Sequence, residues 1–484
     1  MSSSSITEIV NINRQCSPHA NPLFSQFRAD ISCFTLKKFR EHGLSKDELL
    51  NFQKLYPILY PWDENYDFLR FDVNRRFNIF PWMIIMATTD KDVLFGLELA
   101  KKHKIPLALR SGSHSFEGYS LVQGIVIDQS RRKKVWLNQK CKQFTAETGT
   151  LLGPLAVKLF KHHLFEPSGT CANNGLCGLT LGGGIGFTSR AYGLTCDNLL
   201  ELEMILANGK KITVNEKEHT DLFWACKGGG GGNFGIVTKL KLQAYHIDKV
   251  FLYILTTPLH KESLKNLFLT WQKISIHFPD NLSSEFNIIN KEIIITGLYL
   301  GERDEKLQHL LHPLIEHSKK VEIKYVPYIE AARYFTGTAR WLPFFKAKNS
   351  FLSLPFPKSS LPIILKYCSQ PRGTFKVNVL GGKIAEIKPH ETAFDFRHSL
   401  FWLLLNSQWA NEDQQPEFVS WITNFYNELG PYFPGHIYVN TPDAAIPNYL
   451  AQYYGNNLKR LIEVKRKYDP ENIFKYPQSI PTEY

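Results

Sequence analysis

The sequence has 484 residues, of which 43% are hydrophobic and 21% charged, so it is a globular chain too long for one ordinary core. Its net charge of +12 comes from Lys and Arg spread along the chain, which we read as solubility and attraction for an anionic ligand, with no nucleic-acid partner. No apolar run approaches the roughly 20 residues of a membrane helix, and the eight cysteines have neither Cys-x-x-Cys nor zinc spacing, so no membrane partner, disulfide framework or metal site is expected.

The first part of the chain is polar. We expect residues 1 to about 40 to form an irregular, loosely docked leader. Because this stretch lacks the basic start and apolar block of a secretory signal, a cytoplasmic location is the default expectation. A helix is predicted from Ser45 to Tyr56, since Ser45 and Glu48 have the spacing of a capping box and Pro57 stops it.

A strand, a helix and a second strand are predicted next. The apolar runs 82–86 and 105–109 are the strands. The helix between them has oxygens that can cap it at Thr88, Thr89 and Asp90, and one apolar face formed by Val93, Leu94, Leu97 and Ala100. The loop after the second strand therefore lies where α/β sheets usually present ligands.

Further strands and helices follow in alternation. We expect strands at 124–128, 144–148, 202–206, 212–214, 293–296 and 375–379, further strands within 233–247, and helices at 152–163 and 307–317. Asn208-Gly209 between two apolar runs predicts a hairpin.

The loop Arg110-Ser-Gly-Ser-His-Ser-Phe-Glu-Gly-Tyr-Ser120 sets one histidine among glycines and hydroxyls. Such a loop lets the backbone approach a flat or phosphorylated ligand and can turn its N–H groups toward an anion. Taken alone, an ordinary tight turn explains it equally well. Two glycine-rich segments follow at 167–187 and 221–238, but neither has the spacing of a dinucleotide fingerprint or a P-loop.

These segments, with Tyr468-Asp-Pro-Glu-Asn-Ile-Phe474 and Gln478-Ser-Ile-Pro481, resemble the ordered motifs of the berberine-bridge-enzyme-like flavoprotein oxidases. The resemblance runs from about residue 75 to the C-terminus. It implies an α+β fold, with a PCMH-type FAD-binding domain of two α/β subdomains plus an antiparallel-sheet substrate domain. The expected divisions are 1–75 for the leader and the start of the FAD-binding region, 76–247 for the FAD-binding domain, 248–435 for the substrate domain and 436–484 for a C-terminal segment that returns to the FAD domain.

The resemblance further implies FAD as the cofactor, held by two covalent bonds. His114 aligns with the family's flavin-bonding histidine, and Cys171 aligns with the cysteine that makes the second bond. Both side chains can add to an electron-poor flavin, the cysteine as its thiolate, and such bonds should raise the flavin's potential. The alternative is a buried free Cys171 with a His114 that only hydrogen-bonds FAD. The segment Cys171-Ala-Asn-Asn-Gly175 also departs from the family's Cys-Pro-x-Val-Gly.

Other cofactor contacts are expected along the same motifs. They are Arg110, Ser111, Gly112, Ser113, Ser115, Gly118, Tyr119, Ser120, Gly169, Thr170, Gly175, Gly178, Gly182, Gly183, Gly186, Gly232, Asn233, Gly235, Ile236, Val237 and Asn457.

The catalytic residues of the family are only partly present. Dehydrogenation needs a base within reach of the substrate proton, yet the usual positions hold Phe116, Leu404 and Thr441. Tyr438 is the candidate for polarising the substrate, with Asn440 as a helper, although a purely packed Tyr438 is nearly as well supported. Two nearby side chains could take the proton: His436 and Asp443.

The sequence leaves two functions open. The first is an FAD-dependent oxidoreductase that takes a hydride from a small organic alcohol or amine and passes the electrons to dioxygen, giving hydrogen peroxide. The second is a catalytically weakened flavin-binding protein with a ligand-binding or structural role. From Leu404 and Thr441 we expect sugar oligomers to be poor donors.

Overall fold

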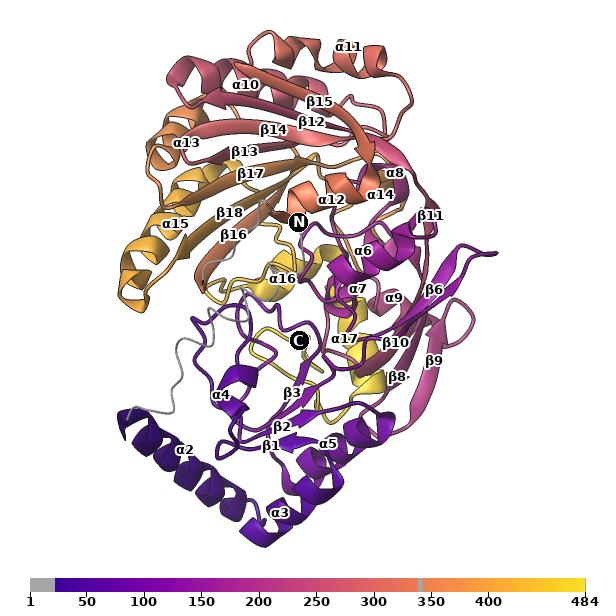
Figure 1. The fold of residues 1–484 in the computed structure, drawn as a ribbon, viewed down its shortest axis with the longest axis vertical. Coiled ribbons are helices and arrows are strands. Elements are labelled where there is room, and N and C mark those ends of the chain that lie inside the picture. The colour runs from indigo at the N-terminus through magenta and orange to yellow at the C-terminus, as the bar shows by residue number, and fades with distance from the viewer. Residues whose placement is uncertain (1–21, 338–342, 484) are drawn as a thin grey trace.

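The computed structural model describes residues 22–337 and 343–483, and Figure 1 shows the fold. The chain begins with α2 (Pro22–Glu41), so the expected irregular leader is wrong from Pro22 onward, and residues 1–21 lie outside the described part. The helix is held by tertiary contacts, since the fully buried ring of Phe39 packs edge-on against Tyr60 and Trp82.

The predicted helix after this leader is confirmed as α3 (Lys46–Leu55). The Ser45 hydroxyl accepts a hydrogen bond from the backbone N–H of Glu48, and the Glu48 carboxylate accepts one from the N–H of Ser45. This is the capping box that the spacing predicted.

The first sheet has four strands in the order β1-β2-β4-β3, and both predicted strands belong to it. Its elements are β1 (Ile58–Leu59), α4 (Tyr66–Leu69), β2 (Met83–Met86), α5 (Asp90–His103), β3 (Leu107–Arg110) and β4 (Ile125–Asp128). The hydroxyl of Thr89 caps α5 with Asp92 as its partner, whereas the predicted cap Asp90 pairs with Arg132 and Lys211. Because β2 and β3 both run parallel to β4, their carboxyl ends lie at one edge of the sheet.

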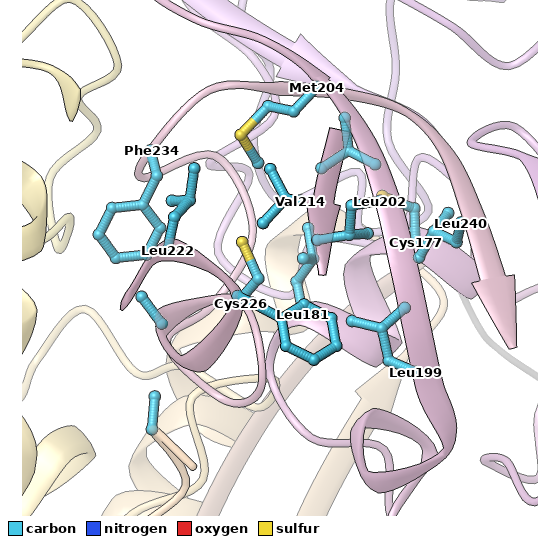
Figure 2. Packing of buried hydrophobic residues seen from close by; sticks show 14 of the residues in the cluster. Cys177, Leu181, Leu199, Leu202, Met204, Val214, Leu222, Cys226, Phe234 and Leu240 are labelled. Atoms are coloured by element: carbon cyan, nitrogen blue, oxygen red, sulfur yellow. The ribbon is translucent and has the colours of Figure 1, made fainter. Parts of the chain in front are cut away.

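The second sheet has five antiparallel strands in the order β5-β6-β10-β8-β9. Its strands are β5 (Val135–Asn138), β6 (Gln143–Glu147), β8 (Leu199–Ile205), β9 (Lys211–Asn215) and β10 (Ile236–Gln243). The associated elements are α6 (Leu152–Phe160), β7 (Leu164–Phe165), α7 (Leu176–Leu181), α8 (Ser189–Tyr192), α9 (Thr220–Ala225) and β11 (Tyr245–His246). Figure 2 shows side chains of this sheet packed against α7 and α9, with Leu181, Leu202 and Leu222 in one core. That packing fixes where the segment before α7 lies.

The third sheet has seven antiparallel strands in the order β15-β12-β14-β13-β17-β18-β16. Its strands are β12 (Lys249–Pro258), β13 (Glu285–Ile289), β14 (Glu292–Tyr299), β15 (Lys320–Pro327), β16 (Phe344–Leu352), β17 (Gly373–Val379) and β18 (Phe401–Trp409). The helices of this region are α10 (Lys261–Ser275), α11 (Asp304–Ile315), α12 (Tyr328–Gly337), α13 (Leu361–Cys368), α14 (Lys383–Glu386) and α15 (Gln415–Leu429). Figure 1 shows α10, α13 and α15 along the outer side of this sheet, where Phe286, Phe375 and Leu403 join their apolar core. Alternate residues of the same strands therefore face inward.

The chain ends with α16 (Tyr449–Tyr454) and α17 (Leu458–Tyr468), and α17 packs against α9 (Figure 1). The buried Lys465 of α17 donates hydrogen bonds to the backbone carbonyls of Asn233 and Phe474 and pairs with Asp469. Asp469 also accepts the N–H groups of Ile473 and Phe474. The C-terminal motif thus fastens the end of the chain to the glycine-rich segment before β10.

Short 3₁₀ turns complete the fold. They are η2 (Thr195–Asn198), η3 (Lys358–Ser360), η4 (Glu412–Gln414), η5 (Gly430–Tyr432) and η6 (Gly455–Asn457). Among the described residues, no helix is both long and apolar enough to cross a membrane.

Candidate active site

A cavity of about 1000 Å³ lies between the first two sheets and the inner face of the seven-stranded sheet. Segments far apart in the sequence form its walls, and most of the sequence-predicted site residues line it. These residues are Arg110, Ser111, Gly112, Ser113, His114, Ser115, Tyr119, Ser120, Gly169, Thr170, Cys171, Gly175, Gly178, Gly186, Gly232, Gly235, Ile236, Val237, Tyr438 and Asn440.

Arg110, the last residue of β3, anchors the histidine loop. Its buried guanidinium donates a 2.6 Å hydrogen bond from Nε to Asp128 and one of 2.6 Å from Nη2 to the carbonyl of Leu69. At the other end of the loop, the Ser120 hydroxyl donates to Asp72, whose pKa is raised to about 6 by burial. Both ends of the loop are therefore fixed by buried carboxylates, and the positive charge of Arg110 is already paired.

His114 and Cys171 line the same cavity. Burial lowers the pKa of His114 to about 4, so its imidazole is neutral at neutral pH. Cys171 is half-buried and forms no disulfide with another described cysteine. A neutral imidazole nitrogen and a cysteine, as its thiolate, are both nucleophiles that can bond to an electron-poor flavin.

Two glycines bring the loops of His114 and Cys171 into contact. A Cβ atom on Gly112 would lie 2.5 Å from the Cα of Gly175, and one on Gly175 would lie 2.8 Å from the Cα of Gly112. Any side chain at either position would push the two backbones apart. The shared cavity wall therefore depends on both glycines.

Two other glycines leave room for a ligand. A Cβ atom on Gly178 would meet nothing within 4 Å, and one on Gly231 would come no nearer than 3.7 Å to the protein. Neither residue has a positive φ. Their lack of a side chain widens the cavity, which suits the flat, anionic FAD that the resemblance implies lying against bare backbone.

Some sequence-predicted contacts lie behind the cavity wall instead. A Cβ atom on Gly118, where φ is +68°, would lie 2.7 Å from Phe77. The amide of Asn233 donates to Gly229 O, and that of Asn457 donates to Pro389 O and Thr392 O. The residues outside the lining are Gly118, Gly182, Gly183, Asn233 and Asn457. Their observed contacts support the wall.

Tyr438 and Asn440 line the cavity as a hydrogen-bonded pair. The hydroxyl oxygen of Tyr438 accepts hydrogen bonds from the N–H of Gly184 at 2.7 Å and from the amide of Asn440 at 2.9 Å. Burial raises the pKa of Tyr438, so the phenol stays protonated. Asn440 fits only because Gly182 lacks a side chain, since a Cβ atom there would lie 2.1 Å from its Oδ1.

The two proposed proton acceptors, His436 and Asp443, lie outside the cavity lining. Burial alone would raise the pKa of Asp443, but ion pairs with Lys346 and Lys348 lower it. The ring of His436 stacks on Phe396 with centroids 4.6 Å apart. Neither is placed to meet a donor in this cavity, which corrects that expectation.

Sequence reasoning missed the inner face of the seven-stranded sheet. Polar residues at alternate positions of three neighbouring strands line the cavity: Glu285, Asn287, Lys376, Asn378, Asn406 and Gln408. The signal was the alternation of these polar residues with the apolar ones of the outer face. Oδ1 of Asn287, Nδ2 of Asn378 and Oδ1 of Asn406 are buried and find no hydrogen-bond partner within the described residues. Because such atoms are costly to leave unbonded, this face is suited to a polar ligand.

No group of three or more His, Cys, Asp or Glu side chains in the described ranges could hold a metal ion.

Two family models match the chain. One is described as an FAD binding domain and covers residues 81–215, and the other is described as berberine and berberine like and covers residues 437–481. The chain is 36% identical to an uncharacterized FAD-linked oxidoreductase of Bacillus subtilis, YgaK, over 87% of this chain and 95% of the relative. It is 30% identical to berberine bridge enzyme-like 24 of Arabidopsis thaliana, over 83% of each protein.

A solved structure agrees with these relatives. The wild-type BBE-like 1 of Physcomitrella patens matches with a TM-score of 0.82 at 27% identity, over 88% of this chain and 97% of that one. The expected α+β architecture with a PCMH-type FAD-binding fold is confirmed.

Proposed function

This chain belongs to the berberine-bridge-enzyme-like family of FAD-linked oxidoreductases, and we propose that it removes a hydride from a small polar organic donor, with FAD attached to both His114 and Cys171. The observation that carries the proposal is the backbone contact between Gly112 and Gly175, which brings the two attachment residues to one cavity. The binding of FAD itself follows from the family. The two bonds to it are our proposal.

When bound, FAD accepts the donor's two electrons as a hydride. The protein's own groups hold the cofactor and place the donor. Glycine-lined backbone at Gly178 and Gly231 leaves space for the cofactor, and the neutral imidazole of His114 is a nucleophile that needs no prior deprotonation. The inner sheet face lies across the cavity from these loops, where it can orient a donor.

The donor we propose is an alcohol or amine with several hydrogen-bonding groups. The buried amide atoms of Asn287, Asn378 and Asn406 support it, because each would gain a partner on binding such a donor. Leu404, which lies beside Lys376 in the sheet register, leaves an apolar spot within this polar face. The expectation that sugar oligomers are poor donors stays a prediction.

The alternative of a catalytically weakened flavin-binding protein rested on Phe116, Leu404 and Thr441. The polar sheet face supplies other groups next to the cofactor cavity, so these three changes do not argue against catalysis. We propose dioxygen as the electron acceptor, with hydrogen peroxide as its product.

The test is an anaerobic donor panel on the purified holoenzyme, with coniferyl alcohol, benzylamine, D-glucose and cellobiose. We expect at least one small donor to bleach the flavin absorbance, and cellobiose to bleach it slowly. Admitting dioxygen should then restore the colour and form one peroxide per flavin reduced. If dithionite bleaches the flavin but none of these donors does, the proposed donor class is overturned. If the colour recovers without forming peroxide, the proposed acceptor is overturned.

A further inference from the structure

We propose that Glu285 is the base of this enzyme, accepting the hydroxyl proton of an alcohol donor as its hydride leaves. The inference rests on the proposed function and names the group that the usual positions do not provide. It is carried by the place of Glu285 in the cavity and by the contacts of the groups around it.

Glu285 is the one carboxylate among the described residues that line the cavity. It is the first residue of β13, only 6% exposed, and it faces inward beside Asn378 of β17 in the sheet register. The next residue, Phe286, points to the opposite face and joins the apolar core under α10. The pleat of the strand therefore directs Glu285 into the cavity.

The lining tyrosines and His114 are poor candidates for the base. The hydroxyl oxygen of Tyr438 is occupied by Gly184 and Asn440, and burial raises the pKa of its phenol. Burial raises the pKa of the other lining tyrosines as well, which are Tyr119, Tyr334, Tyr453 and Tyr476. His114 is the residue assigned to the cofactor bond. The carboxylate of Glu285 is a group of the kind that commonly acts as a general base.

Lys376 forms an ion pair with Glu285. Its Nζ lies 3.1 Å from Oε1 of Glu285, and the two residues come from neighbouring strands. The ion pair holds the carboxylate on the inner face of the sheet, where it can meet the donor. Asn287 and Asn378, on the same face, have buried atoms that can bond the donor's other polar groups.

The donor's O–H bond breaks and its proton forms a new O–H bond with Glu285. The electron pair of that O–H bond becomes the second bond of the product carbonyl. The hydrogen of the adjacent C–H bond leaves with both electrons of that bond as a hydride, which the oxidised flavin would accept. Glu285 then returns the proton to water, so one turnover releases one proton and stores two electrons.

Two groups beside Glu285 enter its pH behaviour. They are Lys376 of β17 and Tyr334 of α12, which both line the cavity. The phenol of Tyr334 stays neutral because burial raises its pKa. The proposal therefore predicts a fall in rate at acid pH that depends on Glu285.

The experiment compares Glu285→Gln with the parent holoenzyme and with Glu292→Gln, a matched control at the exposed start of β14. Each protein is mixed anaerobically with coniferyl alcohol, benzylamine, D-glucose and cellobiose, and the rate of flavin bleaching is followed at several pH values. Flavin content, midpoint potential and the spectral shift on adding coniferaldehyde are measured on the same samples.

We expect Glu285→Gln to slow bleaching by an alcohol donor about 100-fold or more and to lose the fall at acid pH. Flavin content, potential and aldehyde binding should stay within experimental error of the parent, and Glu292→Gln should match the parent throughout. Bleaching of Glu285→Gln within twofold of the parent would overturn the inference, as would a loss explained by lower flavin content or a shifted potential. Failure of the parent itself to be bleached by any donor would overturn the proposed function instead.

Discussion

Gly178 lies in the first turn of α7 and faces the cavity without a side chain. Its backbone conformation is open to any residue, and a Cβ atom there would meet no protein atom within 4 Å. Neither backbone strain nor packing accounts for glycine at this position, which even costs helix stability. The cofactor's need for space does account for it.

We therefore expect Gly178→Leu to fold as well as the parent but to bind little flavin. Leucine favours the helix, so the melting temperature of the flavin-free variant should not fall below that of the flavin-free parent. The leucine side chain, however, fills space that FAD needs. The measurement is the ratio of visible flavin absorbance to protein absorbance, with a decrease of about tenfold or more expected. Gly430→Leu is the matched control, because Gly430 also has nothing within 4 Å of its Cβ position and does not line the cavity. Full flavin content in Gly178→Leu would contradict the assignment of this wall.

Glu166 is a buried carboxyl, 6% exposed, five positions before Cys171 in the sequence. Burial raises its pKa from 4.5 to about 8, although a hydrogen bond with Ser168 partly opposes the rise. Since the folded pKa is the higher one, the stabilisation from the neutral carboxyl is fully present below the unfolded value of 4.5 and is lost as pH rises through about 8.

We predict that the free energy of unfolding falls by roughly 3 kcal/mol between about pH 5 and about pH 8 because of Glu166, and that Glu166→Gln removes this part of the fall. Urea unfolding at a series of pH values measures it. Glu305→Gln, an exposed change on α11, should keep the parent's slope. An unchanged slope in Glu166→Gln would show that another group causes the pH dependence.

The strands and helices could be predicted where the sequence carries a strong local pattern. The capping box at Ser45, the apolar strand 82–86 and the Asn208-Gly209 hairpin each depend on neighbours within a few residues, and each is present. Helix α2 was missed because its sequence carries no strong local helical pattern. It is held instead by the buried ring of Phe39, which packs against residues distant in the sequence. Strand β5 was missed because it is short and half-exposed.

The candidate site was predictable on the cofactor side and not on the donor side. The cofactor contacts expected in a motif such as 110–120 come from neighbouring residues of one loop. Most of them therefore line the cavity together, as expected. The donor side depends on which face of β13, β17 and β18 turns inward, which only the register of the whole sheet decides. Asp443 illustrates the difference. Its position near Tyr438 in the sequence suggested a proton acceptor, but in the fold it pairs with Lys346 and Lys348 of β16.

A buried ion network joins the three parts of the fold. Glu117, within the histidine loop, pairs with Arg76 at 2.9 Å and with Lys346 of the sheet. Lys346 and Lys348 in turn pair with Asp443 of the C-terminal segment. Because Glu117, Lys346, Lys348 and Asp443 are almost fully buried, removing one partner would leave the others uncompensated. The network therefore holds the sheet face at a fixed position over the cofactor loops.

The most direct test of this arrangement is the attachment of the flavin. The purified protein is precipitated with acid, and the yellow colour and fluorescence of the flavin are sought in the precipitate and in the supernatant, for the parent, His114→Ala, Cys171→Ala and the double variant. We predict that the flavin stays with the precipitate in the parent and in both single variants, and enters the supernatant only in the double variant. Flavin in the supernatant of the parent would contradict covalent attachment, and its release from one single variant would contradict the bond assigned to the residue that this variant retains.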